Sequence, residues 1–354
     1  MSGRVLAVIG AQYGSEGKGV VVHHLADKFN VHVRVGGPNA GHSFFHQGAT
    51  GGKVWKMRSL PCGWTNPRAE LVIGAGAVVD LAVLLGELEQ VRKEDPGILK
   101  RLRIDPRAWA VTDEARNFEL QLGMKESIGS TLEGVGQTRI SRISRSLGSD
   151  FRLGSLIDRH HVLRACLSDT VEFLDGVDSN ILLEGTQGSG LSLVHGPWPF
   201  VTSGDTNAAQ LAADVGLSPQ KIDSVLLVAR TFPIRVGGNS GDLYRETTWE
   251  EMSERMGRKV EEFTTVTGRL RRIGHWDPDL FGKAVLLNAP ARVALTFCDY
   301  LDPDVAGING SSDKIERFIK RSIDTVPGTD GVPLIGTGGS YFTIHERFKD
   351  GFWI

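Results

Sequence analysis

The sequence predicts an α/β fold, with a mostly parallel central sheet covered by helices and with long ligand-binding loops. Short runs of Val, Ile and Leu recur along the chain, helical patterns separate them, and most of the runs end in glycine-rich loops. Runs that are apolar on both faces are typical of parallel strands covered on both sides, and strand–helix alternation is typical of α/β sheets. Ligands of such sheets bind at the carboxyl ends of the strands, where these glycine clusters fall.

The expected elements alternate along the chain. Seven apolar runs predict strands at residues 4–10, 31–37, 69–76, 180–188, 221–230, 291–299 and 332–339. Seven helical patterns lie at residues 17–29, 80–93, 112–122, 156–174, 206–215, 277–287 and 312–323. Two long stretches, residues 123–149 and 236–272, do not fit the alternation, and loops of this length are usually functional or disordered. No low-complexity linker divides the chain, so we expect a single domain over residues 1–354.

Composition excludes several classes of function. The 354 residues carry 40 Lys and Arg against 42 Asp and Glu, so bulk attraction to nucleic acid or to anionic lipid is not favoured. Cys62, Cys166 and Cys298 are scattered, which suits a reduced cytoplasmic protein better than a disulfide or zinc scaffold. The longest apolar region, residues 71–86, is interrupted by Asp80 and is shorter than the ~18 residues of a membrane span. We expect a soluble cytoplasmic protein without a nucleic-acid or membrane partner.

The first glycine-rich loop, "GAQYGSEGKGV" at residues 10–20, follows the first predicted strand. Its glycines let backbone N–H groups approach an anion, the following helix adds partial positive charge, and Lys18 adds a full one. The spacing of an ordinary P-loop fails, because Gln12 stands where its first glycine belongs and Gly19 follows the lysine. The loop indicates a polyphosphate site of another kind, with a ligand-free glycine turn as the alternative.

The second loop, "GGPNAGHSF" at residues 36–44, also ends a predicted strand. His42 can donate to a phosphate oxygen or polarise a carbonyl, and Asn39 offers both a donor and an acceptor. Loops at neighbouring strand ends can face one anion, so we expect both loops to belong to one site.

These two loops together resemble the opening of the adenylosuccinate synthetases, and further motifs follow in the family's order. They are "GSTLEGVGQT" at 129–138, "LLEGTQG" at 182–188, "HGPWPFVTSGDT" at 195–206, "EFTTVTGRLRRIGHWD" at 262–277, "VALTFCDYLD" at 293–302 and "LIGTGG" at 334–339. The resemblance covers nearly the whole chain. It implies the P-loop-NTPase-like fold of that family, a homodimer, and Mg²⁺ as cofactor.

The family joins L-aspartate to C6 of a purine monophosphate in two steps. A nucleoside triphosphate phosphorylates O6, and the amine of aspartate then displaces phosphate. The purine O6 is a poor leaving group until it is phosphorylated, and magnesium with basic groups offsets charge on the transferring phosphoryl group.

The resemblance also implies roles for residues of this chain. The catalytic positions are Ser15, Lys18, His42 and Gln187, with His42 as general acid, and the metal ligands are Ser15 and Gly41. The monophosphate contacts are Ser15, Asn39, Ala40, Thr131, Arg145, Gln187, Thr202 and Arg269, with Arg145 reaching across the dimer. The aspartate contacts are Thr265, Val266, Thr267, Arg269 and Arg271, where a guanidinium suits a carboxylate. The triphosphate contacts are Gly14, Glu16, Gly17, Lys18, Gly19, His42, Ser43, Arg271, Phe297, Asp299, Gly336, Thr337 and Gly338, with Asp299 reading the base. Taken singly, most of these residues also fit a structural or surface role.

Ser15 departs from the family, which places there an aspartate that accepts the purine N1 proton and binds magnesium. A serine hydroxyl is neutral and too weak to act as a comparable base without activation. Loss of activity is one interpretation. The other is a change of substrate. Guanine carries an amino group at C2, and serine, shorter than aspartate, leaves room for it. The serine hydroxyl oxygen can also accept a hydrogen bond from that amino group.

This second interpretation matches a phage-encoded branch of the family, the 2-aminoadenylosuccinate synthetases, which act on dGMP on the route to 2-aminoadenine (diaminopurine) DNA. Val20 and Phe297 also replace lysines of the family, and an aromatic ring can stack on adenine as well as on guanine. The resemblance therefore implies a ligase of dGMP and L-aspartate that uses ATP or dATP, with GTP as the alternative donor. The alternatives are an ordinary GTP-dependent adenylosuccinate synthetase acting on IMP and a catalytically silent nucleotide-binding protein.

Overall fold

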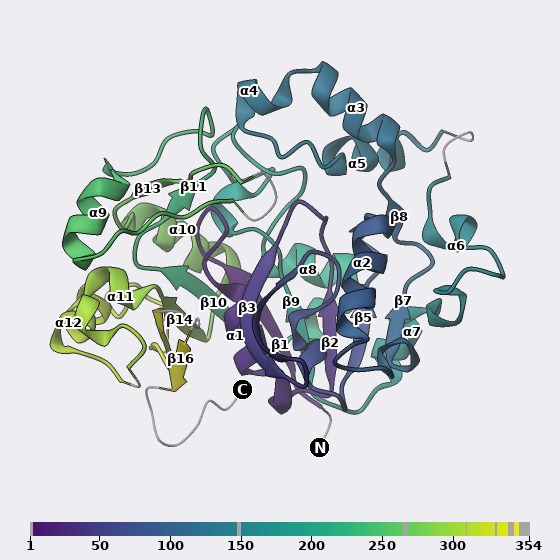
Figure 1. Ribbon diagram of the computed structural model, residues 1–354, viewed down its shortest axis with the longest axis horizontal. Helices are drawn as coiled ribbons and strands as arrows, with labels where there is room; N and C mark the ends of the chain where they lie inside the picture. The colour runs from purple at the N-terminus through teal and green to yellow at the C-terminus, as the bar shows by residue number, and fades with distance from the viewer. Residues whose placement is uncertain are drawn as a thin grey trace.

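A nine-stranded sheet forms the centre of the computed structural model, which describes residues 3–146, 150–264, 268–308, 310–329, 331–338 and 343–346 (Figure 1). From one edge to the other the strands are β16 (Thr343–Glu346), β15 (Leu334–Gly338), β14 (Arg292–Thr296), β10 (Ser224–Arg230), β1 (Val5–Gly10), β9 (Ile181–Glu184), β2 (Val31–Arg34), β5 (Glu70–Ile73) and β7 (Leu102–Ile104). In the described chain every neighbouring pair is parallel except β15 with β16. The predicted mostly parallel α/β sheet is confirmed.

The strands are apolar on both faces because both faces are covered. On β1, Leu6 and Val8 belong to one core cluster, whereas Ala7 and Ile9 belong to the other. The helices on the first face are α1 (Lys18–His24) and α2 (Leu81–Val91). Those on the second face are α8 (Ala208–Val215), α10 (Pro278–Asn288) and α12 (Asp313–Ser322). Burial on both sides explains the continuous Val/Ile/Leu runs of these strands.

All seven predicted strands are present, but one predicted helix is wrong. Residues 156–174 are mostly irregular, with α6 (Leu153–Leu156) at their start and α7 (Thr170–Gly176) at their end. The side chain of Asp169 accepts hydrogen bonds from the backbone N–H groups of Val171 and Glu172. Asp169 therefore caps the start of α7, within the stretch where the sequence pattern predicted one continuous helix. The first helix is also shorter than expected, because a 3₁₀ turn (Ala26–Lys28) follows α1.

Residues 123–149 did not fit the predicted alternation of strands and helices. In the structure they contain part of a helical cap. This cap consists of α3 (Asp113–Gln121), α4 (Met124–Ile128) and α5 (Val135–Ser144). It lies above the sheet in Figure 1, at the carboxyl ends of β1, β2 and β9. The other irregular stretch contains α9 (Trp249–Met256) beside a small sheet of β11 (Ile234–Arg235), β13 (Arg272–Gly274) and β12 (Glu246–Thr247).

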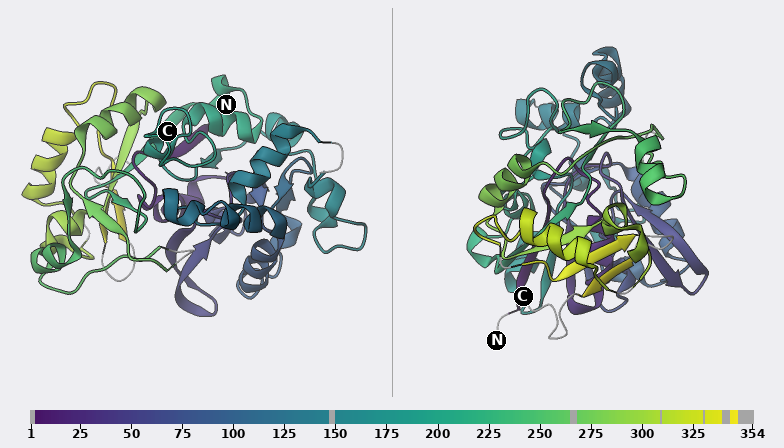
Figure 2. Two further views of the ribbon diagram at one scale, coloured as in Figure 1. Left: turned by 90° about the horizontal axis from the view of Figure 1, so that it is seen from above. Right: turned by 90° about the vertical axis from the view of Figure 1, so that its left-hand side faces the viewer.

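A two-stranded hairpin, which the sequence pattern did not reveal, follows the second glycine loop. Its strands are β3 (His42–Gly48) and β4 (Gly51–Met57), paired antiparallel with each other. Figure 2 shows this hairpin extending from one side of the sheet. Among the described residues, no helix is both long and apolar enough to cross a membrane.

Candidate active site

The phosphate loop, residues 11–17 between β1 and α1, folds around the buried carboxylate of Glu16. This carboxylate accepts hydrogen bonds from the backbone N–H of Gln12 at 3.0 Å and of Gly14 at 2.8 Å, and it pairs with the Lys18 ammonium at 2.7 Å. A buried carboxylate is stable only with such partners. Glu16, expected at the triphosphate, therefore has its side chain committed to holding the loop in shape.

Lys18 joins this loop to the loop that follows β9. Its ammonium group donates both to Glu16 and to the backbone carbonyl of Gln187. The close approach needs a glycine at position 10, because a Cβ there would lie 2.5 Å from the Gln187 carbonyl oxygen and 2.8 Å from the Lys18 ammonium nitrogen. Gln187 itself has a φ of 53°, in the left-handed region that non-glycine residues rarely adopt. Such backbone geometry is typical of functional loops.

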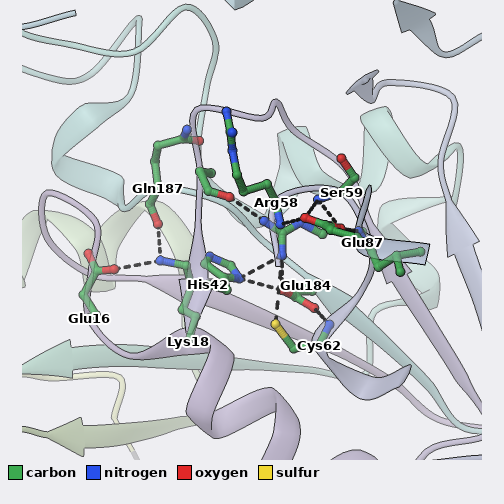
Figure 3. A network of polar contacts seen from close by, with 12 residues as sticks. Glu16, Lys18, His42, Arg58, Ser59, Cys62, Glu87, Glu184 and Gln187 are labelled. Carbon is green, nitrogen blue, oxygen red and sulfur yellow. Dashed lines mark hydrogen bonds and ion pairs between the residues drawn. The ribbon is translucent and has the colours of Figure 1, made fainter. Parts of the chain in front are cut away.

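His42 lies in a buried network that Figure 3 shows beside Lys18. Its Nδ1 is 2.5 Å from the Glu184 carboxylate, which also pairs with the Arg34 guanidinium at 2.7 Å and accepts from the Cys62 backbone N–H at 2.7 Å. Arg34 donates in addition to the Ala40 carbonyl at 2.6 Å. The ends of β2 and β9, neighbours in the sheet, thus fix the histidine and its glycine loop together.

Electrostatics set the protonation of this network. Burial and the nearby Arg34 charge lower the pKa of His42 to about 4. Burial alone would raise the pKa of Glu184, but the Arg34 charge and the His42 hydrogen bond bring it down to about 2. The ionised carboxylate can only accept, so the neutral imidazole carries its proton on Nδ1 and leaves Nε2 unprotonated. His42 can act as an acid only after a bound anion raises its pKa.

Among the described residues, one group of metal-type side chains comes together, formed by His42, Cys62 and Glu184 with ligand atoms within 4.8 Å. Arg34 already neutralises the carboxylate, and burial raises the pKa of the Cys62 thiol well above its usual value. A protonated thiol is a poor metal ligand, so the group does not fit a metal centre. Ser15 and Gly41 instead offer the neutral oxygen donors that suit Mg²⁺ when it is held mainly by phosphates.

Two cavities meet at the phosphate loop. The cap cavity, of about 220 Å³, is lined by residues of α4, α5 and the loops after β2 and β9. The hairpin cavity, of about 500 Å³, is lined by residues of β3, β4, α11 (Cys298–Leu301) and β15. The residues that line both are Ser15, Lys18, Gly41, His42, Thr264 and Arg271. Two ligands can therefore face each other across a lysine and a histidine.

Most of the expected site residues line one of the two cavities or both. The cap cavity is lined by Gly14, Ser15, Asn39, Ala40, Thr131, Gln187 and Thr202. The hairpin cavity is lined by Gly17, Lys18, Gly19, His42, Ser43, Arg271, Phe297, Asp299, Gly336 and Gly338. The first set contains most of the expected monophosphate contacts, and the second contains most of the expected triphosphate contacts.

A few expected residues lie elsewhere. Arg145 is exposed at the end of α5, and Arg269 is half-buried beside Thr264; neither lines the two cavities. Thr337 is buried, with its hydroxyl donating to the Ile308 carbonyl. The aspartate contacts Thr265, Val266 and Thr267 lie outside the described residues.

The structure adds a buried pair that sequence reasoning missed, Arg230 with Glu262. The Arg230 guanidinium pairs with Glu262 at 2.5 Å, donates to the Ser15 carbonyl at 3.1 Å, and lies over the Phe297 ring. Burial alone would raise the pKa of Glu262, but Arg230 outweighs it and lowers that pKa. One sequence signal could have revealed Arg230. It is a charged residue at the carboxyl end of β10, whose preceding five residues are apolar.

A glycine-rich loop at the carboxyl edge of a parallel sheet, with two cavities meeting at Lys18 and His42, defines a nucleotide-binding protein of the α/β class. Comparison with known proteins agrees. The family model "Adenylosuccinate synthetase" matches residues 7–177 and 156–306. The adenylosuccinate synthetase of Methanococcus vannielii is 38% identical over 338 residues, covering 94% of this chain and 95% of the relative. That of Pyrococcus sp. is 35% identical over 351 residues, covering 97% and 98%.

The chain belongs to the adenylosuccinate synthetase family, and it is thereby a ligase that forms a C–N bond. It is also similar to the cyanophage S-2L succinoaminodeoxyadenylate synthetase (PurZ), whose structure holds dGMP and dATP as an energy donor. That similarity has a TM-score of 0.81 at 29% identity and covers 98% of this chain and 96% of the other. The fold is shared as well with the fully ligated adenylosuccinate synthetase of Plasmodium falciparum, with a TM-score of 0.85 at 20% identity, covering 98% of this chain and 100% of the other.

Proposed function

We propose that the protein joins L-aspartate to C6 of dGMP at the expense of ATP or dATP, giving 2-amino-2'-deoxyadenylosuccinate for 2-aminoadenine DNA. The observation that carries the proposal is Ser15, an exposed residue with a φ of 57° that lines both cavities where they meet. A hydroxyl at this position leaves room beside N1 of the purine for a 2-amino group, and its oxygen can accept that group's hydrogen.

The reaction balances in two steps. The purine O6 attacks the γ-phosphorus, the bond to the β-phosphate oxygen breaks, ADP or dADP leaves, and the N1 proton is released. The aspartate amine then attacks C6, the bond from C6 to the phosphoryl oxygen breaks, and inorganic phosphate and a proton leave. Both steps concern atoms between the two nucleotides, which suits the junction of the two cavities.

Residues of the junction have distinct tasks in this scheme. Lys18 supplies a fixed positive charge beside the transferring phosphoryl group. Once the bound phosphates have raised its pKa, His42 can donate to the phosphoryl oxygen on C6 as the bond from C6 to that oxygen breaks in the second step, and Glu184 keeps the imidazole ring in place. Mg²⁺, near Ser15 and Gly41, would offset negative charge on the phosphates when bound.

The base of the donor is expected beside Phe297 and Asp299, which line the hairpin cavity but not the cap cavity. An aromatic surface stacks on adenine or guanine, and similarity to the phage protein with dATP favours an adenine donor. Dimer formation is supported by α5, where the exposed side chains of Ile140 and Ile143 precede Arg145. An apolar helix face of this kind, continuous with Arg145, suits a second copy of the chain.

A second candidate function is the ordinary reaction with IMP and GTP. The archaeal relatives, at 35% and 38% identity over nearly the whole chain, are adenylosuccinate synthetases and favour it. Serine in place of the expected aspartate speaks against it, because IMP has no 2-amino group for that hydroxyl to contact.

The test compares dGMP with IMP in parallel assays of inorganic phosphate release with ATP, Mg²⁺ and L-aspartate. We expect turnover with dGMP that depends on aspartate, and weak turnover with IMP. The Ser15→Asp variant should lose activity with dGMP by about tenfold or more and gain activity with IMP, because the larger carboxylate fills the space beside C2. Undiminished use of dGMP by this variant would contradict the steric argument, and wild-type turnover with IMP alone would assign the protein to the second candidate.

A further inference from the structure

Among the residues that the structure describes, one ammonium group of the hairpin cavity has no carboxylate at ion-pair distance. Its Lys and Arg side chains are Lys18, Lys56, Arg258, Lys259 and Arg271. Four of these form ion pairs, which are Lys18 with Glu16, Arg258 with Asp299, Lys259 with Glu261, and Arg271 with Glu262. Within the described residues, Lys56 has no carboxylate at ion-pair distance. A triphosphate in this cavity would therefore meet Lys56 as its least compensated cation.

The register of the hairpin places Lys56 beside the start of β3, close to His42. Lys56 lies directly opposite Ser43, and His42 lies opposite Met57. Directly opposed residues of an antiparallel pair project from the same face, so Lys56 projects on the same side as Ser43, and both line the cavity. Lys56 is thus paired with the residue that follows His42.

Close packing holds this part of the hairpin against α1. A Cβ at Gly19 would lie 2.9 Å from the Cβ of His42 and 3.1 Å from the backbone N of Ser43. Glycine at this position lets the first turn of α1 contact the start of β3. The first turn of α1, which follows the phosphate loop directly, therefore lies close against the start of the hairpin.

The two faces of β4 have different surroundings. Val54 and Lys56 line the hairpin cavity, whereas Trp55 and Met57 are buried in the core. Lys53 shares the core-side face and places its ammonium 3.8 Å from the centre of the Trp55 ring. Alternation along a strand explains this division, and it assigns the two lysines of β4 to different environments.

We propose that Lys56 binds the phosphates of the nucleoside triphosphate and supplies the positive charge that Val20, an apolar residue of the same cavity, does not. This proposal rests on the proposed function only in placing the triphosphate in the hairpin cavity. It does not depend on which purine accepts aspartate. The long side chain of Lys56 rotates freely, so its ammonium group can adjust to the position of the phosphates.

The test measures binding of Mg²⁺–ATP by titration calorimetry to the wild type, Lys56→Gln, Lys56→Arg and Lys53→Gln. We expect Lys56→Gln to weaken ATP binding about tenfold, as for the loss of one charge-assisted contact. Lys56→Arg should keep affinity within about threefold, since it keeps the charge. Lys53→Gln is the matched control, removing the same charge from the other face of the same strand, and should leave affinity unchanged.

Steady-state kinetics give an independent readout. Lys56→Gln should raise KM for ATP about tenfold and leave KM for the purine monophosphate unchanged. An ATP affinity of Lys56→Gln within twofold of the wild type would overturn the proposal, as would an equal loss in Lys53→Gln. A wild type that binds ATP through Lys56 but forms no product from dGMP would contradict the proposed acceptor and support the role of Lys56.

Discussion

The guanidinium of Arg230 lies 3.8 Å from the centre of the Phe297 ring and donates to the backbone carbonyl of Ser15. Ser15 belongs to the junction of the two cavities, and Phe297 belongs to the expected donor-base end of the hairpin cavity. One fully buried cation thus supports two positions that face different ligands. Glu262 pairs with the Arg230 guanidinium, so this buried charge is compensated inside the protein.

Replacing Arg230 by lysine is expected to affect both nucleotides. Arg230→Lys keeps the charge beside Glu262 but loses the planar fork that reaches several partners at once. We expect KM for both the donor and the acceptor to rise about fivefold or more, with a stability loss of about 1–2 kcal/mol. The measurements are steady-state kinetics with each substrate varied in turn and urea unfolding.

Arg103→Lys is the matched control, because Arg103 also pairs with a glutamate, Glu70, and lies 4.2 Å from the centre of the Phe173 ring. It lies on β7 at the sheet edge, outside the lining of both cavities. This variant should leave both KM values unchanged. An Arg230→Lys enzyme that loses stability but keeps both KM values would show that Arg230 has no role in positioning Ser15 or Phe297.

Glu184→Gln is expected to lower kcat about 100-fold while the KM values change little. Glu184 orients His42 and keeps its proton on Nδ1, and replacing the carboxylate that holds a catalytic histidine in the correct tautomer by an amide lowers kcat by orders of magnitude. An amide presents only one accepting oxygen, so at least one of the donors Arg34, His42 and the Cys62 N–H loses its acceptor. The kcat/KM split and the pH profile of kcat measure this positioning role.

Glu87→Gln provides the comparison. Glu87 is also a buried carboxylate, and it accepts from the backbone N–H groups of Ser59 and Leu60 without contacting His42. We expect a similar stability loss, of about 1–3 kcal/mol, with kcat preserved. Equal losses of kcat in the two variants would indicate general destabilisation and remove the case for Glu184 as a positioning residue.

The fold should lose stability as pH falls from about 6.5 to about 4. Burial lowers the pKa of His32 and of His42 from 6.5 to about 4. In this range the unfolded chain takes up protons that the folded chain does not, so acid favours unfolding. The free energy of unfolding, measured with urea at pH 7, 6 and 5, should fall at each step.

Nuclear magnetic resonance of the histidine rings separates this effect from that of carboxylates. The signal of His42, assigned with His42→Gln, should titrate well below pH 6 in the free protein and at higher pH when Mg²⁺–ATP is bound, because the phosphates stabilise the imidazolium. Titration of His42 near 6.5 in the free protein would contradict the buried neutral state derived from the structure.

Sequence reasoning located the strands and the loops at their ends because both signals are local. The β1 strand is apolar at every position, and the glycines around Lys18 mark the following turn. The hairpin was not predicted, since in the described part of the chain its two strands pair with each other and with no strand of the central sheet. The pair of Arg230 and Glu262 was also missed, because 32 residues separate them and only tertiary packing brings them together. The resemblance supplied most of the cavity residues, whereas the charges that hold them in place came from the structure.

The strand order determines when β1 meets its partner strands during synthesis. The first strand, β1, lies between β9 and β10, so Val5 pairs with Ile181 and Leu6 with Ser224. A ribosome therefore releases β1 long before either neighbour exists, and a six-residue apolar segment stays without its hydrogen-bonding partners while about half of the chain is made. Such distant pairing slows folding and exposes the nascent chain to aggregation. The hydrogen bond from Lys18, just after the phosphate loop, to the carbonyl of Gln187 can likewise form only once that residue has been made.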